Sequence, residues 1–302
     1  MKKFLGIDVG GTNVKMAAVN RDGKFIDRRK YPTAELNEKG FVPCFVAIVG
    51  EYLNEYPEIQ KVGIGIPGML SKNRRTPLEV PAIPQLNNVN LHKILQQRFP
   101  DNKFAMENDA NAAALGEYHF AENPDMPETF LFITLGTGVG GAAIINRVIF
   151  SGGDGNGLDL GHTLSSNGTR LEQNIGKAGI MGIACQLMKS YDGSTQIESL
   201  ENMSPKELSA YAAEGDPFAQ KLFYEVGNFL GESLVTTIRV LDIKTVLIGG
   251  GVSAVFDHIK DAMLGPMRKY LTNYYMDDVD IQRAVLGNRA GIIGAASLCF
   301  MD

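Results

Sequence analysis

The chain has 302 residues, a formal net charge of −5 and a hydrophobic fraction of 44%. This length allows two packed lobes, whereas an acidic chain offers no positive field for nucleic acid or an anionic membrane. No apolar run approaches the ~18 residues of a membrane span, and Asp8 interrupts the first apolar run too early for a signal peptide. The cysteines Cys44, Cys185 and Cys299 are too scattered for a disulfide framework or a metal cluster. A reduced, cytoplasmic setting is therefore expected.

The first predicted element is a β-hairpin over residues 4–19, whose turn is suited to phosphate. Two apolar runs flank a segment that contains Asp8, Gly10, Gly11, Thr12 and Asn13. A turn of glycines leaves backbone N–H groups uncovered for phosphate oxygens. Because Asp8 would repel a bare phosphate, it indicates a bridging Mg²⁺ bound through water. Taken alone, the segment could equally be an ordinary glycine-rich hairpin turn.

The stretch up to residue 108 alternates apolar strands with helical patterns. Its predicted elements are a strand over 25–29, a helix over 35–56 broken only at Pro43, a strand over 61–66, a loop over 71–90, a helix over 91–98 and a strand over 103–106. Gly68 follows the strand over 61–66, in a Pro-Gly pair that reads as an ordinary turn by default.

Asp109 stands where the strand over 103–106 gives way to an alanine-rich helix that begins near Ala110. A carboxylate at this position can cap the helix by accepting hydrogen bonds from its first N–H groups. At the end of a strand it can also accept a proton from a substrate hydroxyl group. The residues alone leave both roles open.

Residues 130–141 repeat the first hairpin in register, with Thr134 in the place of Asp8. The positions of this second turn expected to contact phosphate are Thr134, Gly136, Thr137 and Gly138. Threonine hydroxyl groups can donate hydrogen bonds to phosphate directly. Two such hairpins half a chain apart predict two related lobes that face each other across a cleft.

The rest of the chain is predicted to be mainly helical. The expected elements are helices over 181–190, 205–213, 216–241, 256–271 and 289–300 and strands over 244–248 and 279–283. The glycine triplet 249–251, followed by Val252 and Ser253, could lie beside the base or ribose of a nucleotide. The alternative is a plain loop that leads into a helix.

Together these motifs resemble the actin-like sugar kinases. The segments that carry the resemblance are Asp8-Val9-Gly10-Gly11-Thr12, the run from Thr134 to Gly141, and Ile248-Gly249-Gly250-Gly251. The run from Glu107 to Glu117 is similar to the branch called ROK (repressors, open reading frames, kinases). The resemblance implies an α/β, two-lobed actin-like (ribonuclease H-like) sugar kinase fold with a central cleft. Residues 1–113 plus 288–302 would form the small lobe and 114–287 the larger one.

The resemblance also implies ATP and Mg²⁺ as cofactors, a hexose as substrate and a homodimer. The nucleotide contacts that it implies are Asp8, Gly10, Gly11, Thr12, Asn13, Thr134, Gly136, Thr137, Gly138, Gly250 and Gly251. The sugar contacts that it implies are Gly68, Asn108, Asp109, Asp159, His162 and Glu172, with Asp109 as general base. Asp159 stands where the family usually has glutamate, and is one methylene shorter.

The chain departs from the family at a zinc-binding stretch. Most members have a cysteine-rich segment between the histidine and the next sugar-binding glutamate, whereas residues 163–171 contain no cysteine. A structural zinc site needs about four thiolate or imidazole ligands. We therefore expect no zinc site.

The predicted function is ATP- and Mg²⁺-dependent phosphorylation of glucose at its 6-hydroxyl group, with the cleft closing on the sugar. A kinase for N-acetylmannosamine, fructose or allose is the first alternative. A sugar-responsive repressor is disfavoured, because the charge is acidic and the first strand begins near residue 3. A non-catalytic sugar-binding regulator is disfavoured because Asp8, Asp109 and both glycine turns are intact.

Overall fold

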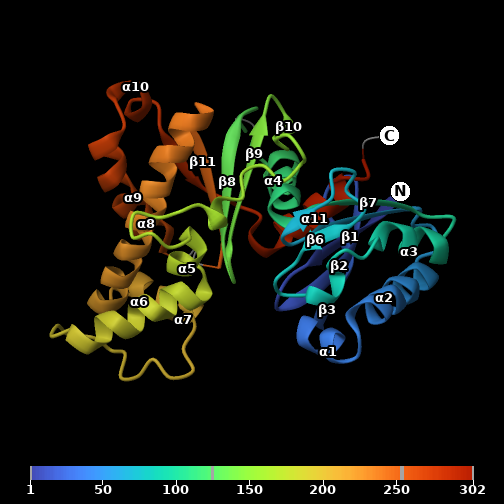
Figure 1. Ribbon diagram of the computed structural model, residues 1–302, viewed down its shortest axis with the longest axis horizontal. Helices are drawn as coiled ribbons and strands as arrows, with labels where there is room; N and C mark the ends of the chain where they lie inside the picture. The colour runs from blue at the N-terminus through green and yellow to red at the C-terminus, as the bar shows by residue number, and fades with distance from the viewer. Residues whose placement is uncertain (1, 124–125, 252–254, 301–302) are drawn as a thin grey trace. The chain divides into compact units, whose positions relative to one another are not determined.

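The computed structural model describes residues 2–123, 126–251 and 255–300 (Figure 1). Contacts between residues divide the chain into two compact units. The first unit comprises Met1–Met126, Ala142–Leu158 and Asn288–Asp302, and the second comprises Pro127–Gly141 and Asp159–Gly287. The division into functional lobes at residues 113 and 288 stays a prediction.

A five-stranded sheet forms the centre of the first unit, with the strand order β3-β2-β1-β4-β7. Its strands are β1 (Lys3–Val9), β2 (Asn13–Asn20), β3 (Phe25–Pro32), β4 (Lys61–Ile66) and β7 (Lys103–Asn108). The hairpin strands β1 and β2 pair antiparallel, as do β2 and β3, while β1, β4 and β7 run parallel. Three parallel strands therefore end at one edge of this sheet.

Helices cover both faces of the first sheet. They are α1 (Thr33–Glu38), α2 (Phe41–Glu55), α3 (Leu91–Arg98), α4 (Asp109–Phe120) and α11 (Ala290–Ser297). Alternate residues of β1 point to opposite faces, so Leu5, Ile7 and Val9 join the apolar residues of α2 in one core. The other face receives α11, since a Cβ atom at Gly6 would lie 2.1 Å from the carbonyl oxygen of Ile292. Glycine in β1 lets this C-terminal helix lie directly on the strand.

The second sheet has the order β10-β9-β8-β11-β12. It repeats the order of the first sheet, with the hairpin β8–β9 in the place of β1–β2, β10 in that of β3, and β11 and β12 in those of β4 and β7. Its strands are β8 (Phe130–Leu135), β9 (Val139–Ile145), β10 (Val148–Ile149), β11 (Thr245–Gly250) and β12 (Asp280–Arg283). Here too β8, β11 and β12 run parallel. The internal repeat expected from the two glycine-turn hairpins is thus present in the strand order.

The remaining helices belong to the second unit. They are α5 (Leu171–Ile175), α6 (Lys177–Ser190), α7 (Pro205–Ala213), α8 (Pro217–Leu241), α9 (Phe256–Tyr270) and α10 (Asn273–Met276). The long helix α8 begins after Asp216, whose carboxylate accepts a hydrogen bond of 2.9 Å from the N–H group of Ala219. Its apolar side is buried and packs against α9.

Two expected elements differ from the structure. The helix predicted over 35–56 is two helices, and the chain breaks at Lys39 and Gly40, where Gly40 has φ +91°, rather than at Pro43. Pro43 lies in the first turn of α2, where an N–H group has no partner within the helix, so proline is tolerated. The loop expected over 71–90 contains the short strand β6 (Pro77–Glu79), which pairs with β5 (Met69–Leu70), and the 3₁₀ turn η1 (Pro84–Leu86).

No helix in the described part of the chain is both long and apolar enough to span a membrane.

Candidate active site

Polar residues collect at the edge of the first sheet where its parallel strands end. Asp8 lies near the end of β1, Gly68 follows β4, and Asn108 ends β7. Ligands of open α/β sheets bind outside the carboxyl ends of parallel strands. The predicted sugar and phosphate residues of the first unit therefore share one edge.

The first glycine turn is fixed by a residue that the sequence did not single out. The N–H group of Gly10 donates to the carbonyl oxygen of Asn13 at 3.0 Å. Thr33, which is fully buried, donates its hydroxyl group to the carbonyl of Gly10 at 2.7 Å and its N–H group to that of Thr12 at 3.0 Å. The outer residues Gly11 and Thr12 remain exposed, as a phosphate-binding turn requires.

Asp8 has a partner in the opposite strand of the same hairpin. The ammonium nitrogen of Lys15 lies 2.8 Å from Asp8 Oδ2, and the two residues face each other in the register of β1 and β2. Lys15 was absent from the sequence prediction, although the hairpin register would have placed it opposite Asp8. A single carboxylate suits Mg²⁺, which keeps several waters and binds to phosphates through one or two acidic ligands. Asp8 fits that requirement.

The N-cap residue of α4 is Asn108, which precedes Asp109. Asn108 Oδ1 accepts from the N–H groups of Ala110 at 2.9 Å and Asn111 at 3.2 Å, and its Nδ2 donates to the carbonyl of Gly68 at 3.1 Å. Asp109 is the first residue of α4 and is half-buried. Its Oδ1 also accepts a hydrogen bond of 2.9 Å from the N–H group of Ala110, so Asp109 shares the capping contact with Asn108.

Glu172 lies against the second glycine turn, within the second unit. Its Oε2 accepts a hydrogen bond of 3.1 Å from the N–H group of Val139, and a Cβ atom at Gly138 would lie 2.0 Å from the same oxygen. Inside the turn, the N–H group of Gly136 donates to the carbonyl of Gly138 at 2.9 Å. Thr134 lies at the end of β8, and Thr137 is exposed in the turn.

The third glycine element also joins this turn. Gly250 ends β11 with φ +99°, and a Cβ atom there would lie 2.1 Å from the carbonyl oxygen of Leu135. Only glycine fits that approach. The N–H group of Gly251 donates to the same carbonyl at 2.7 Å. Val252 and Ser253, the next residues of the predicted nucleotide element, lie outside the described residues.

Asp159 and His162 form a pair across the 3₁₀ turn η2 (Leu160–His162). His162 Nδ1 lies 2.8 Å from Asp159 Oδ2, and both side chains are 37% exposed. A carboxylate at Nδ1 favours the proton on that nitrogen, so Nε2 is left as the acceptor in the neutral ring. The aspartate, although shorter than glutamate, reaches the imidazole.

The interval from which cysteines are missing is held by side-chain amides. Asn167 Nδ2 donates to Asn174 Oδ1 at 2.9 Å, and the Thr169 hydroxyl group donates to Asn167 Oδ1 at 2.8 Å. Asn174 is buried in α5, the helix that carries Glu172. Among the described residues there is no group of three or more His, Cys, Asp or Glu side chains that could hold a metal ion.

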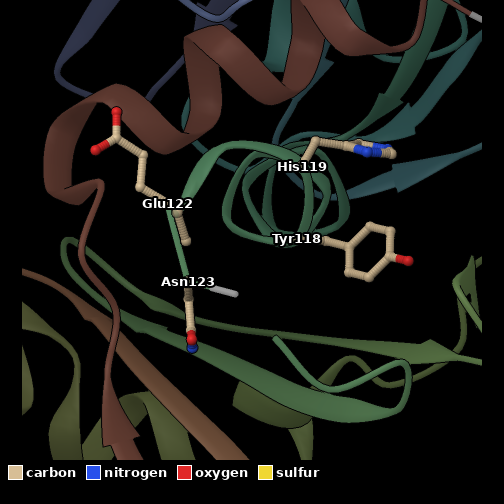
Figure 2. Close-up of a pocket in the computed structure, with 5 residues that line it drawn as sticks. Tyr118, His119, Glu122 and Asn123 are labelled. Atoms are coloured by element: carbon tan, nitrogen blue, oxygen red, sulfur yellow. The ribbon is translucent and has the colours of Figure 1, made fainter. Parts of the chain in front are cut away.

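A hollow with a volume of about 350 Å³ lies at the C-terminal end of α4 (Figure 2). Its lining residues are Tyr118, His119, Ala121, Glu122 and Asn123. Burial lowers the pKa of His119, so its ring is neutral near pH 7. The hollow contains no predicted site residue, and the chemistry expected from the sequence lies at the sheet edge instead.

Comparison with known proteins identifies relatives along nearly the whole chain. The model of the ROK family matches residues 4–301. A glucokinase of Thermotoga maritima is 30% identical, over 98% of this chain and 96% of its own. An N-acetylmannosamine kinase of Haemophilus influenzae is 27% identical, over 97% of this chain and 94% of its own.

Solved structures show the same fold. A protein of Cytophaga hutchinsonii, provisionally described as a sugar kinase, has a TM-score of 0.90 at 39% identity, with 99% of each chain covered. A ROK family glucokinase of Streptomyces griseus, solved with glucose and AMPPNP, has a TM-score of 0.84 at 28% identity, with 98% of each chain covered. The expected actin-like α/β sugar kinase fold is confirmed.

Proposed function

The chain belongs to the ROK family, as a sugar kinase of that family, and we propose that it transfers the terminal phosphoryl group of ATP to the 6-hydroxyl group of glucose. The observation that carries this proposal is the position of Asp109. Its carboxylate begins α4 at the sheet edge that also holds Asp8, and Asn108 is the N-cap residue of that helix. Asp109 can then serve as the proton acceptor that phosphoryl transfer to a hydroxyl group requires.

The nucleotide phosphates would bind at the glycine turns. Exposed backbone at Gly11 and Thr12 in the first turn, and at Gly136 and Thr137 in the second, offers N–H and hydroxyl donors. The remaining residues proposed for the nucleotide are Asp8, Gly10, Asn13, Thr134, Gly138, Gly250 and Gly251. When bound, Mg²⁺ would neutralise charge on the phosphates. Asp8 would hold it, and Lys15 would orient the Asp8 carboxylate across the hairpin.

The sugar would be bound by the carboxylates of Asp109, Asp159 and Glu172, the imidazole of His162, the amide of Asn108 and the backbone at Gly68. With Nδ1 of His162 facing Asp159, Nε2 can accept a hydrogen bond from a sugar hydroxyl group. The carboxylate of Glu172 would accept a hydrogen bond from another sugar hydroxyl group while it keeps its hydrogen bond from the N–H group of Val139. Asn108 would hold Gly68 and the start of α4, and the second N–H of its Nδ2 would donate to a sugar hydroxyl group.

A different hexose is the alternative that the comparisons favour, since the similar proteins include a kinase for N-acetylmannosamine. The predicted lobes and the homodimer also stay proposals. Purified protein should be assayed for ADP release with ATP, Mg²⁺ and a panel of glucose, N-acetylmannosamine, N-acetylglucosamine, fructose and allose. We expect glucose to give the highest kcat/KM. ADP release that none of these sugars stimulates would contradict the proposal, and a preference for another sugar would correct its substrate.

A further inference from the structure

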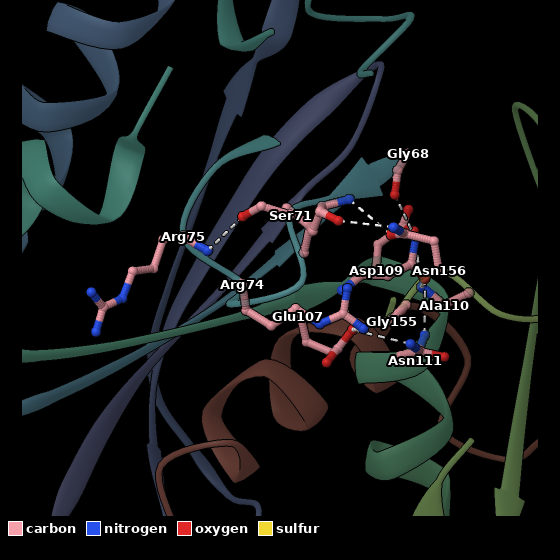
Figure 3. Close-up of polar contacts among 12 residues, drawn as sticks. Gly68, Ser71, Arg74, Arg75, Glu107, Asp109, Ala110, Asn111, Gly155 and Asn156 are labelled. Atoms are coloured by element: carbon pink, nitrogen blue, oxygen red, sulfur yellow. Dashed lines mark hydrogen bonds and ion pairs between the residues drawn. The ribbon is translucent and has the colours of Figure 1, made fainter. Parts of the chain in front are cut away.

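The side chains of Arg74 and Glu107 form an ion pair beside the segment that carries Asn108 and Asp109 (Figure 3). Arg74 Nη2 lies 3.2 Å from Glu107 Oε1, and the side chains are 17% and 10% exposed. Neither residue belongs to the sugar or nucleotide sets above. A buried ion pair is weak evidence for a role in stability, because desolvation offsets the attraction of the charges. The other contacts of the two side chains therefore decide what the pair does.

Glu107 contacts the residue before Asp109 through its backbone and a residue after it through its side chain. The oxygen that faces Arg74, Oε1, accepts a hydrogen bond of 2.8 Å from the N–H group of Asn108. It also accepts one of 3.0 Å from Nδ2 of Asn111, which lies in the first turn of α4. A single carboxylate oxygen thus connects the residue before Asp109 to a residue after it.

Arg74 is held in an unusual backbone conformation. Its φ of 56° lies in the left-handed region, where residues other than glycine are uncommon. The turn is closed by hydrogen bonds from Arg74 N–H to the Ser71 carbonyl at 2.7 Å and from Ser71 N–H to the Thr76 carbonyl at 2.8 Å. The Ser71 hydroxyl oxygen accepts two more N–H groups, those of Arg75 and Thr76. This turn aims the Arg74 side chain at Glu107, as Figure 3 shows.

The Arg74 guanidinium also contacts a second segment of the first unit, residues 150–157. Arg74 Nη2 donates to the carbonyl oxygen of Gly155. A Cβ atom at buried Gly155 would lie 2.7 Å from Nη2 and 2.8 Å from Cζ, so the guanidinium rests directly on this glycine. Next to it, Asn156 accepts from Leu70 N–H and donates to the Leu70 carbonyl, each at 2.9 Å. The segment is therefore tied to β5 as well as to Arg74.

We propose that Arg74 and Glu107 are positioning residues for Asp109, and that Gly155 keeps the Arg74 guanidinium on Glu107. The inference rests on the proposed function, in which Asp109 is the general base. A base acts well only when its oxygen is held accurately against the reacting hydroxyl group. Glu107 fixes the backbone that carries Asp109, and Arg74 compensates the charge of Glu107, so that Asp109 does not adjoin an unpaired carboxylate.

The test uses Arg74→Met, Glu107→Gln, their double variant and Gly155→Ala, with Gly215→Ala as matched control. Both glycines have φ +96°, so alanine strains the backbone alike at each, whereas a Cβ atom meets the guanidinium at Gly155 and nothing within 4 Å at Gly215. With the sugar that the wild-type enzyme prefers, we expect kcat to fall by roughly 10- to 100-fold in Arg74→Met, Glu107→Gln and Gly155→Ala, because misplacing a reacting group costs about that much. The control variant should keep the wild-type kcat. The KM values for sugar and ATP should change by less than about threefold. The double variant should be no slower than the slower single variant, since the two residues act as a unit.

A second readout needs no catalysis. Amide hydrogen exchange in the peptide that spans 107–113 should quicken in Arg74→Met and Gly155→Ala and stay unchanged in Gly215→Ala. Failure of the proposed function would appear as a wild-type enzyme that phosphorylates no sugar, and the exchange comparison would still decide the positioning claim. The positioning claim would be overturned if kcat and hydrogen exchange in these variants equalled those of the wild type. A loss of ligand binding in parallel with the loss of kcat would overturn it as well. If the variants that remove a charge do not fold, the comparison of Gly155→Ala with Gly215→Ala decides the claim, because both of these variants keep Arg74 and Glu107.

Discussion

The carboxylate of Glu172 accepts a hydrogen bond of 3.1 Å from the backbone N–H group of Val139, directly after the second glycine turn. A residue proposed to bind the sugar is thereby fixed to a turn proposed to bind phosphate. The turn is also closed by its own hydrogen bond from the N–H group of Gly136 to the carbonyl of Gly138, so position 172 should affect the affinity for sugar more than the shape of the turn.

We predict that Glu172→Ala raises the sugar KM by roughly 10- to 100-fold, the effect of losing a charge-assisted hydrogen bond of about 1.5–3 kcal/mol. The KM for ATP should change little. Steady-state kinetics with each substrate varied in turn will measure both constants, with the exposed Glu198→Ala as control. A sugar KM equal to that of the wild type would exclude Glu172 as a sugar ligand.

Asp109→Asn tests the proposed base. The variant should fold and bind sugar, because Asn108 remains the N-cap of α4 and the amide oxygen of asparagine can still accept from the N–H group of Ala110. Its turnover should fall by roughly two to four orders of magnitude, the usual contribution of general acid–base catalysis. The exposed Asp101→Asn is the control. Single-turnover kinetics together with calorimetric sugar titration will separate chemistry from binding, and turnover within a few-fold of the wild type would end the assignment.

The amide cluster of Asn167, Thr169 and Asn174 leads to a prediction about metal content. Because hydrogen bonds between these side chains hold the 163–170 segment to α5, no zinc is required there. We expect purified protein to contain no stoichiometric zinc and to keep its thermal midpoint in the presence of a chelator. Elemental analysis that finds about one tightly bound zinc per chain would contradict this.

Asp216 provides a pH-dependent contribution to stability. Burial alone would raise its pKa, but hydrogen bonds from the N–H groups of Ala219 and Gln196 and the Thr195 hydroxyl group outweigh burial and lower it. A carboxyl group whose pKa is lower in the folded state stabilises the fold above its unfolded pKa, and that stabilisation is lost as the pH falls through the folded pKa.

Asp216→Asn should therefore lower the thermal midpoint at pH 7, because Nδ2 cannot accept from Thr195 and Gln196. The difference from the wild type should shrink as the pH falls below about 4, near the unfolded pKa of aspartate. Scanning calorimetry from pH 7 to pH 3 will measure it, with the exposed Asp192→Asn alongside. A difference that is constant or grows toward acid pH would show that the charge of Asp216 does not stabilise α8.

Local patterns were sufficient to predict much of the fold. The helix expected over 205–213 is α7, and the two hairpins occupy equivalent places in two sheets of the same strand order. The patterns failed at the boundary between α1 and α2. Pro43 was taken as the helix break because proline disrupts helix interiors, but its place in the first turn of α2 makes it harmless.

The candidate site shows a second limit. Asp109 was singled out correctly as a polar residue between a strand and a helix, but which neighbour caps the helix depends on side-chain geometry, and Asn108 does so. Thr33, Arg74 and Gly155 carried no local signal. Arg74 and Gly155 are 81 positions apart in the chain, and only the folded first unit brings them together.

The central claim, phosphoryl transfer to the 6-hydroxyl group of a hexose with Asp109 as base, is tested most directly by identifying the product. Phosphorus-31 and carbon-13 NMR spectra should be recorded on wild-type protein and Asp109→Asn, each incubated with ATP, Mg²⁺ and carbon-13-labelled glucose. We predict one sugar phosphate, with phosphorus coupled to carbon 6, formed in step with ADP by the wild type and reduced by roughly two to four orders of magnitude in the variant. Release of inorganic phosphate without any sugar phosphate, or equal rates of sugar phosphate formation in the two proteins, would contradict the account.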